Sequence, residues 1–319
     1  MREFDRESDS FTRIRPKGGD RREGGSGRGE AALDDAFAEY AAQFWPQAAE
    51  EAVTAPEVLP DGVRWTTWDQ SSPTERGPLP HPDWVITELG AQDTELGIVK
   101  TGKEADVFLL ERAVPGTGRR TLLAAKRYRD GQHRMFHRDA GYLEGRRHKE
   151  SRVSRAMEKR TAFGRQAIAG QWAAAEFGAL CGLYEAGAAV PYPVQIVGTE
   201  ILMEFIGDED GTAAPRLAQL RPEPDELEDL WWQLGASLSV LARAGHAHGD
   251  LSAYNILVDQ GRLVLIDVPQ IVDVIANPQG RGFLERDVRN VGAWFRSRGL
   301  HPDRVAGLLA DLALDAGLD

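Results

Sequence analysis

The sequence holds a single cysteine, fewer basic than acidic residues, and no long apolar run. One cysteine, Cys181, excludes a disulfide within the chain and a zinc site built from thiolates, because both need several thiols. The 38 Lys and Arg stand against 50 Asp and Glu, and the net charge of -12 argues against a protein that coats nucleic acid over its whole surface. Apolar runs fall short of the roughly 18 residues of a membrane-spanning helix, and residues 1–6 lack the apolar core of a signal peptide. These absences predict a cytoplasmic protein without a membrane anchor.

The N-terminal part of the chain is poor in large apolar side chains. Residues 1–30 hold eight Lys or Arg, seven Asp or Glu and six Gly, so they can bury too little to offset the entropy of ordering. Seven prolines then punctuate residues 46–82 and interrupt regular elements. We therefore expect residues 1–85 to be a largely disordered or linker-like extension and residues 86–319 to form the folded domain. Trp65 and Trp68, inside the proline-rich stretch, either pack on that domain or are incidental.

After residue 86 the pattern changes to short strands and then to helices. Strand-like runs occupy residues 97–100, 106–111, 121–128, 193–197 and 201–205. A helix with apolar residues at helical spacing is predicted over 171–186. The pattern is mainly helical after Asp225, apart from a hairpin over 255–259 and 262–267 around Gln260 and Gly261. This order predicts an α+β fold of two lobes, an antiparallel sheet lobe over about 86–206 and a short helical lobe over about 207–319, with a ligand cleft between them.

One segment reverses the charge of the chain. Residues 127–165 carry twelve Lys or Arg against five acids, a net charge of +7. A solvated surface loop is one interpretation. Contact with phosphates, either of a nucleotide or of RNA, is the other.

The strongest chemical signal is a set of oxygen ligands near the hairpin. His248-Gly249-Asp250 is followed by Asn255 and then by Asp267, twelve residues further on. Phosphoryl transfer from ATP needs a carboxylate that orients or deprotonates the acceptor hydroxyl, and hard oxygen ligands that hold magnesium on the phosphates. Because the hairpin returns the chain, we expect Asp267 to face Asn255.

A second signal is a charged pair upstream of that set. Lys126 ends an apolar strand, and Glu176 lies on an otherwise apolar helix. An unpaired buried ammonium is costly, so Glu176 is the expected partner. Together they would hold the phosphates of the nucleotide, as the strand lysine and helix glutamate do in protein kinases.

The motifs taken in order resemble the RIO family of atypical serine/threonine protein kinases, nearer its type-one branch. Residues 101–107, TGKEADV, are similar to the RIO pattern S/T-G-K-E-A-x-V that replaces the glycine-rich loop of ordinary kinases. Residues 266–270, IDVPQ, are similar to the RIO I-D-x-x-Q, and 202–207, LMEFIG, resemble the hinge M-x-F-I-G. The likeness covers roughly residues 86–300. Type-one members also carry a flexible loop at the place of the basic segment.

This resemblance implies a role for each matching residue. Asp250 would be the catalytic base, Asn255 and Asp267 the metal ligands, and Lys126, paired with Glu176, a phosphate contact. Lys103 would contact the nucleotide, and the backbone at Glu204 and Ile206 would meet the adenine. A phosphoaspartate intermediate would form on Asp267, so that turnover resembles that of an ATPase.

The implied cofactors are ATP and Mg²⁺, with Mn²⁺ as an alternative metal. The implied partners are a protein substrate or the chain itself, and ribosomal RNA or a ribosomal subunit through residues 127–165. We expect a monomer. Two other functions stay open: a small-molecule phosphotransferase of the aminoglycoside or choline kinase type, and an ATP-gated module that binds ribosomal RNA.

Overall fold

The computed structural model describes residues 59–129, 162–268 and 271–318. The chain divides into two units at residues 59 and 60, and the elements described below belong to the second, residues 60–319. The expectations for residues 1–58, for residues 130–161 and for Pro269 and Gln270 lie outside the described residues.

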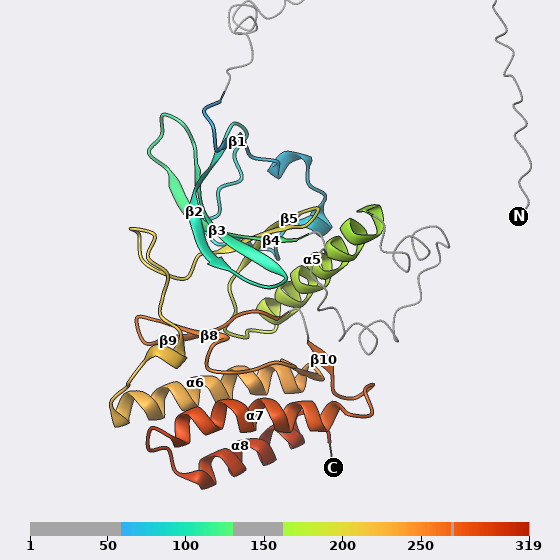
Figure 1. Ribbon diagram of the computed structural model, residues 1–319, viewed down its shortest axis with the longest axis vertical. Coiled ribbons are helices and arrows are strands. Elements are labelled where there is room, and N and C mark those ends of the chain that lie inside the picture. The colour runs from blue at the N-terminus through green and yellow to red at the C-terminus, as the bar shows by residue number, and fades with distance from the viewer. Residues whose placement is uncertain (1–58, 130–161, 269–270, 319) are drawn as a thin grey trace, which may run out of the picture. The chain divides into compact units, whose positions relative to one another are not determined.

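The first part of this unit is a six-stranded antiparallel sheet with the strand order β1-β2-β3-β4-β6-β5 (Figure 1). Its strands are β1 (Val63–Trp65), β2 (Gln92–Thr101), β3 (Ala105–Ala113), β4 (Arg120–Tyr128), β5 (Pro193–Val197) and β6 (Glu200–Glu204). The tight β5–β6 turn contains Gly198 with φ +59°, a conformation that glycine adopts at little cost. The sheet lobe expected from the sequence is confirmed.

The folded unit begins earlier than residue 86. β1 pairs with β2 through Val63 and Thr94, so it belongs to the sheet. Trp68, in the short helix η1 (Trp68–Gln70), is buried and packs with Val85 against Leu110 of the sheet. Residues 60–85 are therefore part of the domain and not a linker, because their irregular, proline-rich segments bury aromatic side chains on the outer face of the sheet.

The opposite face of the sheet packs against α5 (Ala162–Glu185). Phe177 of this helix meets Tyr128 of β4 and Ile201 of β6 in one apolar cluster. We call this the α5 face of the sheet. The helix begins nine residues before the predicted start at residue 171, so residues 162–165 of the basic segment lie in α5, and Arg127 lies in β4.

Three helices form the second lobe: α6 (Pro224–Arg243), α7 (Gly280–Arg296) and α8 (Pro302–Asp315) (Figure 1). Helix α8 packs on both α6 and α7. Leu234 of α6, Phe295 of α7 and Leu312 of α8 lie in its apolar core and are fully or almost fully buried. Among the described helices, none combines the length and the apolar character that crossing a bilayer requires.

Two short pairs of antiparallel strands lie between α6 and α7 in the chain. β8 (Ile256–Asp259) pairs with β9 (Arg262–Leu265), and β7 (His246–Ala247) pairs with β10 (Val272–Asp273). Gln260, in the turn between β8 and β9, has φ +50° and precedes Gly261, as the sequence predicted for a tight turn. These pairs carry the chain from α6 to α7 and place the loops that precede β8 and follow β9 side by side.

In the β2–β3 hairpin, β2 is paired on both sides over only part of its length. At its base, the guanidinium of Arg112 makes two hydrogen bonds to Asp93, at 2.6 and 2.9 Å, and both side chains are buried. β1 pairs only with Gln92, Asp93 and Thr94, so the rest of β2 has one neighbour, β3. The ladder between β2 and β3 is interrupted by irregularities at Leu96 and at Val99.

Candidate active site

Lys126 of β4 lies between two carboxylates from different parts of the chain. Its Nζ is 2.6 Å from Oε1 of Glu176 on α5 and 2.7 Å from Oδ1 of Asp267, which follows β9. The expected pair of Lys126 and Glu176 is therefore present, and Asp267 joins it. The contact brings together the sheet lobe, α5 and the loop after β9.

This contact shifts the pKa values of Lys126 and Asp267. Burial alone would lower the pKa of Lys126, but the two carboxylates outweigh it and raise that pKa above its usual value. Burial likewise acts to raise the pKa of Asp267, yet the Lys126 ammonium and its hydrogen bond hold that pKa below the ordinary range. Lys126 and Asp267 therefore both carry their charges at neutral pH, which phosphate and metal binding require.

Tyr128 holds the second oxygen of Glu176. Its hydroxyl donates a hydrogen bond to Oε2 of Glu176, whose side chain is almost fully buried. Burial raises the pKa of Tyr128, and the carboxylate raises it further, so the hydroxyl keeps the proton that it donates. Sequence reasoning missed this residue. The available signal was its position two residues after Lys126, which places both side chains on one face of β4.

Asp267 has a backbone conformation that is rare outside glycine. Its φ is +65°, in the left-handed region, where residues other than glycine are uncommon and where functional sites are over-represented. The preceding residue, Ile266, donates its backbone N–H to the carbonyl of Asn255 at 2.9 Å. The hairpin therefore brings Asp267 beside Asn255, as the spacing predicted.

The loop between β7 and β8 carries Asp250 and is tied at several points. The side-chain amide of Asn255 donates to the backbone carbonyl of Asp250 at 2.9 Å, and the Asp250 side chain is exposed. A ring nitrogen of His248, Nε2, lies 3.1 Å from the carbonyl of Ile266, so this buried histidine links the loop to the chain just before Asp267. Asp250, Asn255 and Asp267 thus lie on connected backbone segments.

A buried acid on helix α7, Asp287, anchors the same loop. The two oxygens of Asp287 accept the backbone N–H groups of Gly249, at 2.7 Å, and of Leu251, at 3.0 Å, on either side of Asp250. Burial raises the pKa of Asp287, while these two donors act in the opposite direction. Arg286 donates to the carbonyl of Gly249. Asp287 was not predicted from the sequence.

The residues expected to meet the adenine lie at the end of β6: Glu204 is its last residue, and Ile206 follows two positions later. The carbonyl of Ile206 accepts the N–H of Ala214 at 2.9 Å, and the N–H of Glu204 donates to the carbonyl of Tyr192 at 2.8 Å. Ile206 is buried with Ala214 and Val264 in a small apolar cluster, against which Leu257 and Ile266 pack. An apolar cluster next to strand-end backbone groups is suited to a flat aromatic base.

Lys103 is exposed in the turn between β2 and β3. The N–H of Gly102 closes this turn on the carbonyl of Ala105 at 3.0 Å, and a Cβ at residue 102 would lie only 2.7 Å from that carbonyl oxygen. The turn therefore requires glycine for steric reasons. Among the described contacts, none brings Lys103 to Asp267 or Lys126.

The oxygen donors of Asn255 and Asp267 fit a hard divalent metal ion. Asn255 uses its amide nitrogen to bond Asp250, which leaves its carbonyl oxygen as the metal-binding atom, and Asp267 has an oxygen, Oδ2, with no bond to a described residue. Such oxygens suit hard cations of the Mg²⁺ type. The described residues contain no cluster of three or more His, Cys, Asp or Glu, so a metal here would depend on phosphate oxygens and water for its remaining ligands.

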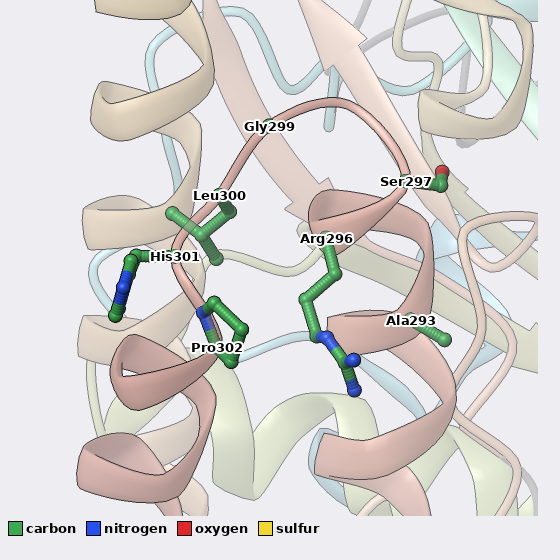
Figure 2. Close-up of a pocket in the computed structure, with 7 residues that line it drawn as sticks. All are labelled: Ala293, Arg296, Ser297, Gly299, Leu300, His301 and Pro302. Atoms are coloured by element: carbon green, nitrogen blue, oxygen red, sulfur yellow. The ribbon is translucent and has the colours of Figure 1, made fainter.

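A surface pocket lies away from these groups. It is lined by Ala293, Arg296, Ser297, Gly299, Leu300, His301 and Pro302, at the junction of α7 and α8 (Figure 2). Its residues on α7 begin six positions after Asp287, about 9 Å along the helix axis. The Ser297 hydroxyl donates to the Trp294 carbonyl, and His301 caps α8 by accepting the Asp303 N–H. These polar groups serve the helix ends, so the pocket is not assigned to the chemistry.

A strand lysine between a helix glutamate and a loop aspartate, in a fold of one sheet lobe and one helical lobe, defines the class of protein-kinase-like, ATP-dependent phosphotransferases. Comparison with known proteins narrows the class. Residues 119–306 match the model of the RIO domain, and the chain belongs to the RIO family of serine/threonine kinases.

Relatives of known name agree with this assignment. The chain is 34% identical over 227 residues to the RIO-type serine/threonine-protein kinase Rio1 of Haloferax volcanii, a match that covers 69% of each chain. It is 34% identical to the serine/threonine-protein kinase RIO1 of Chaetomium thermophilum, over 64% of this chain and 40% of the relative. It is 30% identical to the RIO3 kinase of Mus musculus, over 68% and 41%. The chain thus spans less than half of these two eukaryotic relatives, and its resemblance to the type-one branch is consistent with the RIO1 names. The family implies ATP and a divalent metal as cofactors.

Proposed function

We propose that this protein transfers the γ-phosphoryl group of ATP to a serine or threonine hydroxyl at the site that contains Asp250. The observation that carries the proposal is the placement of Lys126 between Glu176 and Asp267, beside a loop in which Asn255 is tied to Asp250. In the reaction the bond between the γ-phosphorus and the β,γ-bridging oxygen breaks, ADP leaves, and a bond forms from phosphorus to the acceptor oxygen. The proton of the acceptor hydroxyl passes to Asp250.

Each residue of the site has a separate task in this proposal. Lys126 binds phosphate oxygens, and Glu176 keeps the lysine in place when Asp267 turns to other ligands. The segment of Glu204 and Ile206 binds adenine through its backbone. Asn255 and Asp267 are the ligands for Mg²⁺, or Mn²⁺ in its place. The ion, when bound, neutralises charge that develops on the phosphates.

A substitution at Asp250 tests the proposal. Asp250→Asn keeps the shape of the side chain and removes the base, so the rate of phosphate transfer should fall by at least about 100-fold while the affinity for ATP stays within about twofold. The rate is measured with γ-labelled ATP, Mg²⁺ and a generic serine-containing acceptor such as myelin basic protein, and the affinity by calorimetric titration. Asp259→Asn, at the turn end of β8, is the matched control and should keep the wild-type rate. Wild-type transfer by Asp250→Asn would contradict the assignment.

The same label separates a kinase from an ATPase that works through a phosphoaspartate. Hydroxylamine cleaves an acyl phosphate on Asp267 and leaves phosphoserine intact. Label on the protein that resists hydroxylamine supports autophosphorylation on serine or threonine. Label that hydroxylamine removes, and that is absent in Asp267→Asn, supports the ATPase cycle instead.

The proposals on partners rest on the sequence. We propose a protein substrate or the chain itself as the acceptor, a monomeric state, and ribosomal RNA or a ribosomal subunit as the partner of the basic segment. Of the twelve basic residues in that segment, Arg127 already pairs with Glu95 and Glu200, and Arg129 pairs with Asp106. An RNA contact would therefore depend on the other ten basic residues, from Arg134 to Arg165.

A further inference from the structure

The irregularity at Val99 decides which face of β2 carries Lys100. Ile98 lies opposite Phe108 and Lys100 lies opposite Val107, although Phe108 and Val107 are adjacent on β3. β2 therefore holds one extra residue, Val99, between two paired positions, which is a β-bulge. In a regular strand Ile98 and Lys100 would share a face. The bulge turns Lys100 to the opposite face, and bulges beside active sites commonly re-aim a side chain in this way.

The face that Lys100 occupies is the face of Lys126. Lys100 pairs with Val107 of β3, and Val107 pairs with Lys126 of β4, so the three residues form one row across the sheet. Directly opposed residues of antiparallel strands point to the same face. Lys126 points to the α5 face, where it bonds Glu176, and so does Lys100. With strands about 4.8 Å apart, the two lysine Cα atoms are about 10 Å apart, a span that two long side chains cover by converging on one anion.

Lys100 has no acidic partner of its own among the described residues. No ion pair joins it to any described carboxylate, whereas Lys126 has two. Partial burial lowers the pKa of Lys100, and the positive charges of Arg216 and Lys126 lower it further against the opposite effect of Asp267. Arg216 is fixed nearby by a hydrogen bond to the carbonyl of Tyr254, in the loop that carries Asp250. Arg216 and Lys126 thus both lie close enough to Lys100 for their charges to repel its own, and a polyanion placed among the three would relieve this repulsion.

We propose that Lys100 is a second phosphate-binding lysine, which contacts the terminal phosphates of the nucleotide from β2 while Lys126 contacts them from β4. The inference rests on the proposed function, because it needs ATP at this site. It distinguishes Lys100, which lies in one row of the sheet with Lys126, from Lys103, which lies in the turn, although both side chains are exposed. The consequence is a site that favours nucleoside triphosphates and diphosphates over nucleosides more strongly than one lysine would allow.

The test compares ligands that differ only in their phosphates. Lys100→Gln and the control Arg120→Gln each remove one positive charge, and Arg120 lies at the opposite end of β4 from Lys126, on the surface. ATP with Mg²⁺, and adenosine without phosphates, are titrated into each full-length variant by calorimetry. Lys100→Gln should weaken ATP binding about tenfold or more and leave adenosine binding unchanged, because a charge-assisted hydrogen bond is lost. Arg120→Gln should change neither, and Lys100→Arg should keep most of the ATP affinity.

Other outcomes would overturn the inference. If Lys100→Gln weakened the binding of ATP and of adenosine equally, the role of Lys100 would be to stabilise the fold of the β2–β3 hairpin and not to bind phosphate. An ATP affinity of Lys100→Gln equal to that of the wild type would remove Lys100 from the phosphate site and leave the proposed function intact. A wild-type protein that binds no ATP would overturn both.

Discussion

Lys126 is shared by two carboxylates, and the sharing has a chemical consequence. Glu176 is buried and keeps a second hydrogen bond, from Tyr128, whereas the side chain of Asp267 is 39% exposed. The contact to Asp267 is therefore the one that a nucleotide can exchange for phosphate oxygens, while the contact to Glu176 persists. Asp287 plays a comparable fixed role on the other lobe, since it holds the backbone on both sides of Asp250.

Asp287→Asn tests that positioning role. The amide offers one acceptor oxygen in place of two and sets its NH₂ against a backbone N–H, so one buried donor loses its partner at a cost of about 1–3 kcal/mol. We expect the free energy of unfolding in urea to fall by that amount. We also expect the amides of Gly249 and Leu251 to exchange faster with deuterium, with a lower kcat and a nearly unchanged KM for ATP.

Glu285→Gln is the matched control, because Glu285 lies on the same helix and pairs only with exposed arginines among the described residues. It should leave exchange, stability and kcat close to those of the wild type. Unchanged exchange at Gly249 and Leu251 in Asp287→Asn would contradict the role given to Asp287.

Sequence reasoning found some site residues and missed others for a physical reason. The loop and hairpin between Asp250 and Asp267 are local, so their spacing alone brought Asn255 beside Asp267. Asp287 binds the backbone of Gly249 and Leu251, which precede it by 38 and 36 positions, through contacts that no local motif encodes. Its signal was an acid within the buried apolar stripe of α7, between Leu284 and Val291. A buried acid in such a stripe needs donors, and the donors here are backbone groups of the other loop.

At the scale of elements, α8 is attached to α6 by a polar contact at its C-terminal end. Asp315 accepts hydrogen bonds from Ser239 and from Arg243, the latter at 3.1 Å. The Ser239 hydrogen bond, followed by the Arg243 contacts, holds the pKa of Asp315 below its usual range. Because the pKa is lower in the folded than in the unfolded chain, this contact stabilises the protein above about pH 4 and is lost as the pH falls through the folded-state pKa.

Asp315→Asn should therefore flatten the dependence of stability on pH on the acid side. We expect the free energy of unfolding to fall by up to about 1 kcal/mol at pH 7, and we expect this difference from the wild type to shrink as the pH falls below about 4. Chemical denaturation at a series of pH values measures this. Asp311→Asn, an exposed position on the same helix, is the control and should follow the wild type throughout. A constant deficit of Asp315→Asn down to pH 2 would contradict the titration and point to lost packing.

The elements themselves were predicted better than their ends. β4, β5 and the β8–β9 hairpin agree with the sequence pattern within about two residues, because turn residues mark their limits. α5 was predicted nine residues short at its start, where the apolar spacing that marks a helix is interrupted by Gly164 and Gly170. β2 was predicted only over residues 97–100, because most of its ten residues are not buried and therefore lack a clear alternation.

At the scale of the whole molecule, the start of the folded unit is the main difference from the sequence prediction. Proline density placed the boundary near residue 86, yet prolines are compatible with irregular segments that pack well. Gly77, in such a segment, donates its N–H to the carbonyl of Val194, and Tyr192 donates its hydroxyl to the carbonyl of Pro78. Burial of Trp68 completes the attachment. Local composition does not report contacts of this kind.

Two truncations test the boundary. A fragment of residues 60–319 should unfold with the same midpoint as the full chain, because the second compact unit begins at Pro60. A fragment of residues 86–319 loses β1 and the buried Trp68, and its stability should fall by at least about 3 kcal/mol, as for removal of a buried aromatic side chain. Thermal denaturation followed by circular dichroism compares them. Equal midpoints for both fragments would return residues 60–85 to the role of a linker.

Beyond Thr94, β2 is an edge strand of the sheet. β3 pairs with β4 along its whole length, from Ala105 to Ala113, whereas this part of β2 has a neighbour on one side only. A strand bonded on one side has fewer hydrogen bonds to hold it, so the stretch of β2 near Lys100 can shift while β3 stays in place. A ligand that contacts Lys100 would thus be gripped and released by movement of this edge alone, without disturbing the sheet behind it.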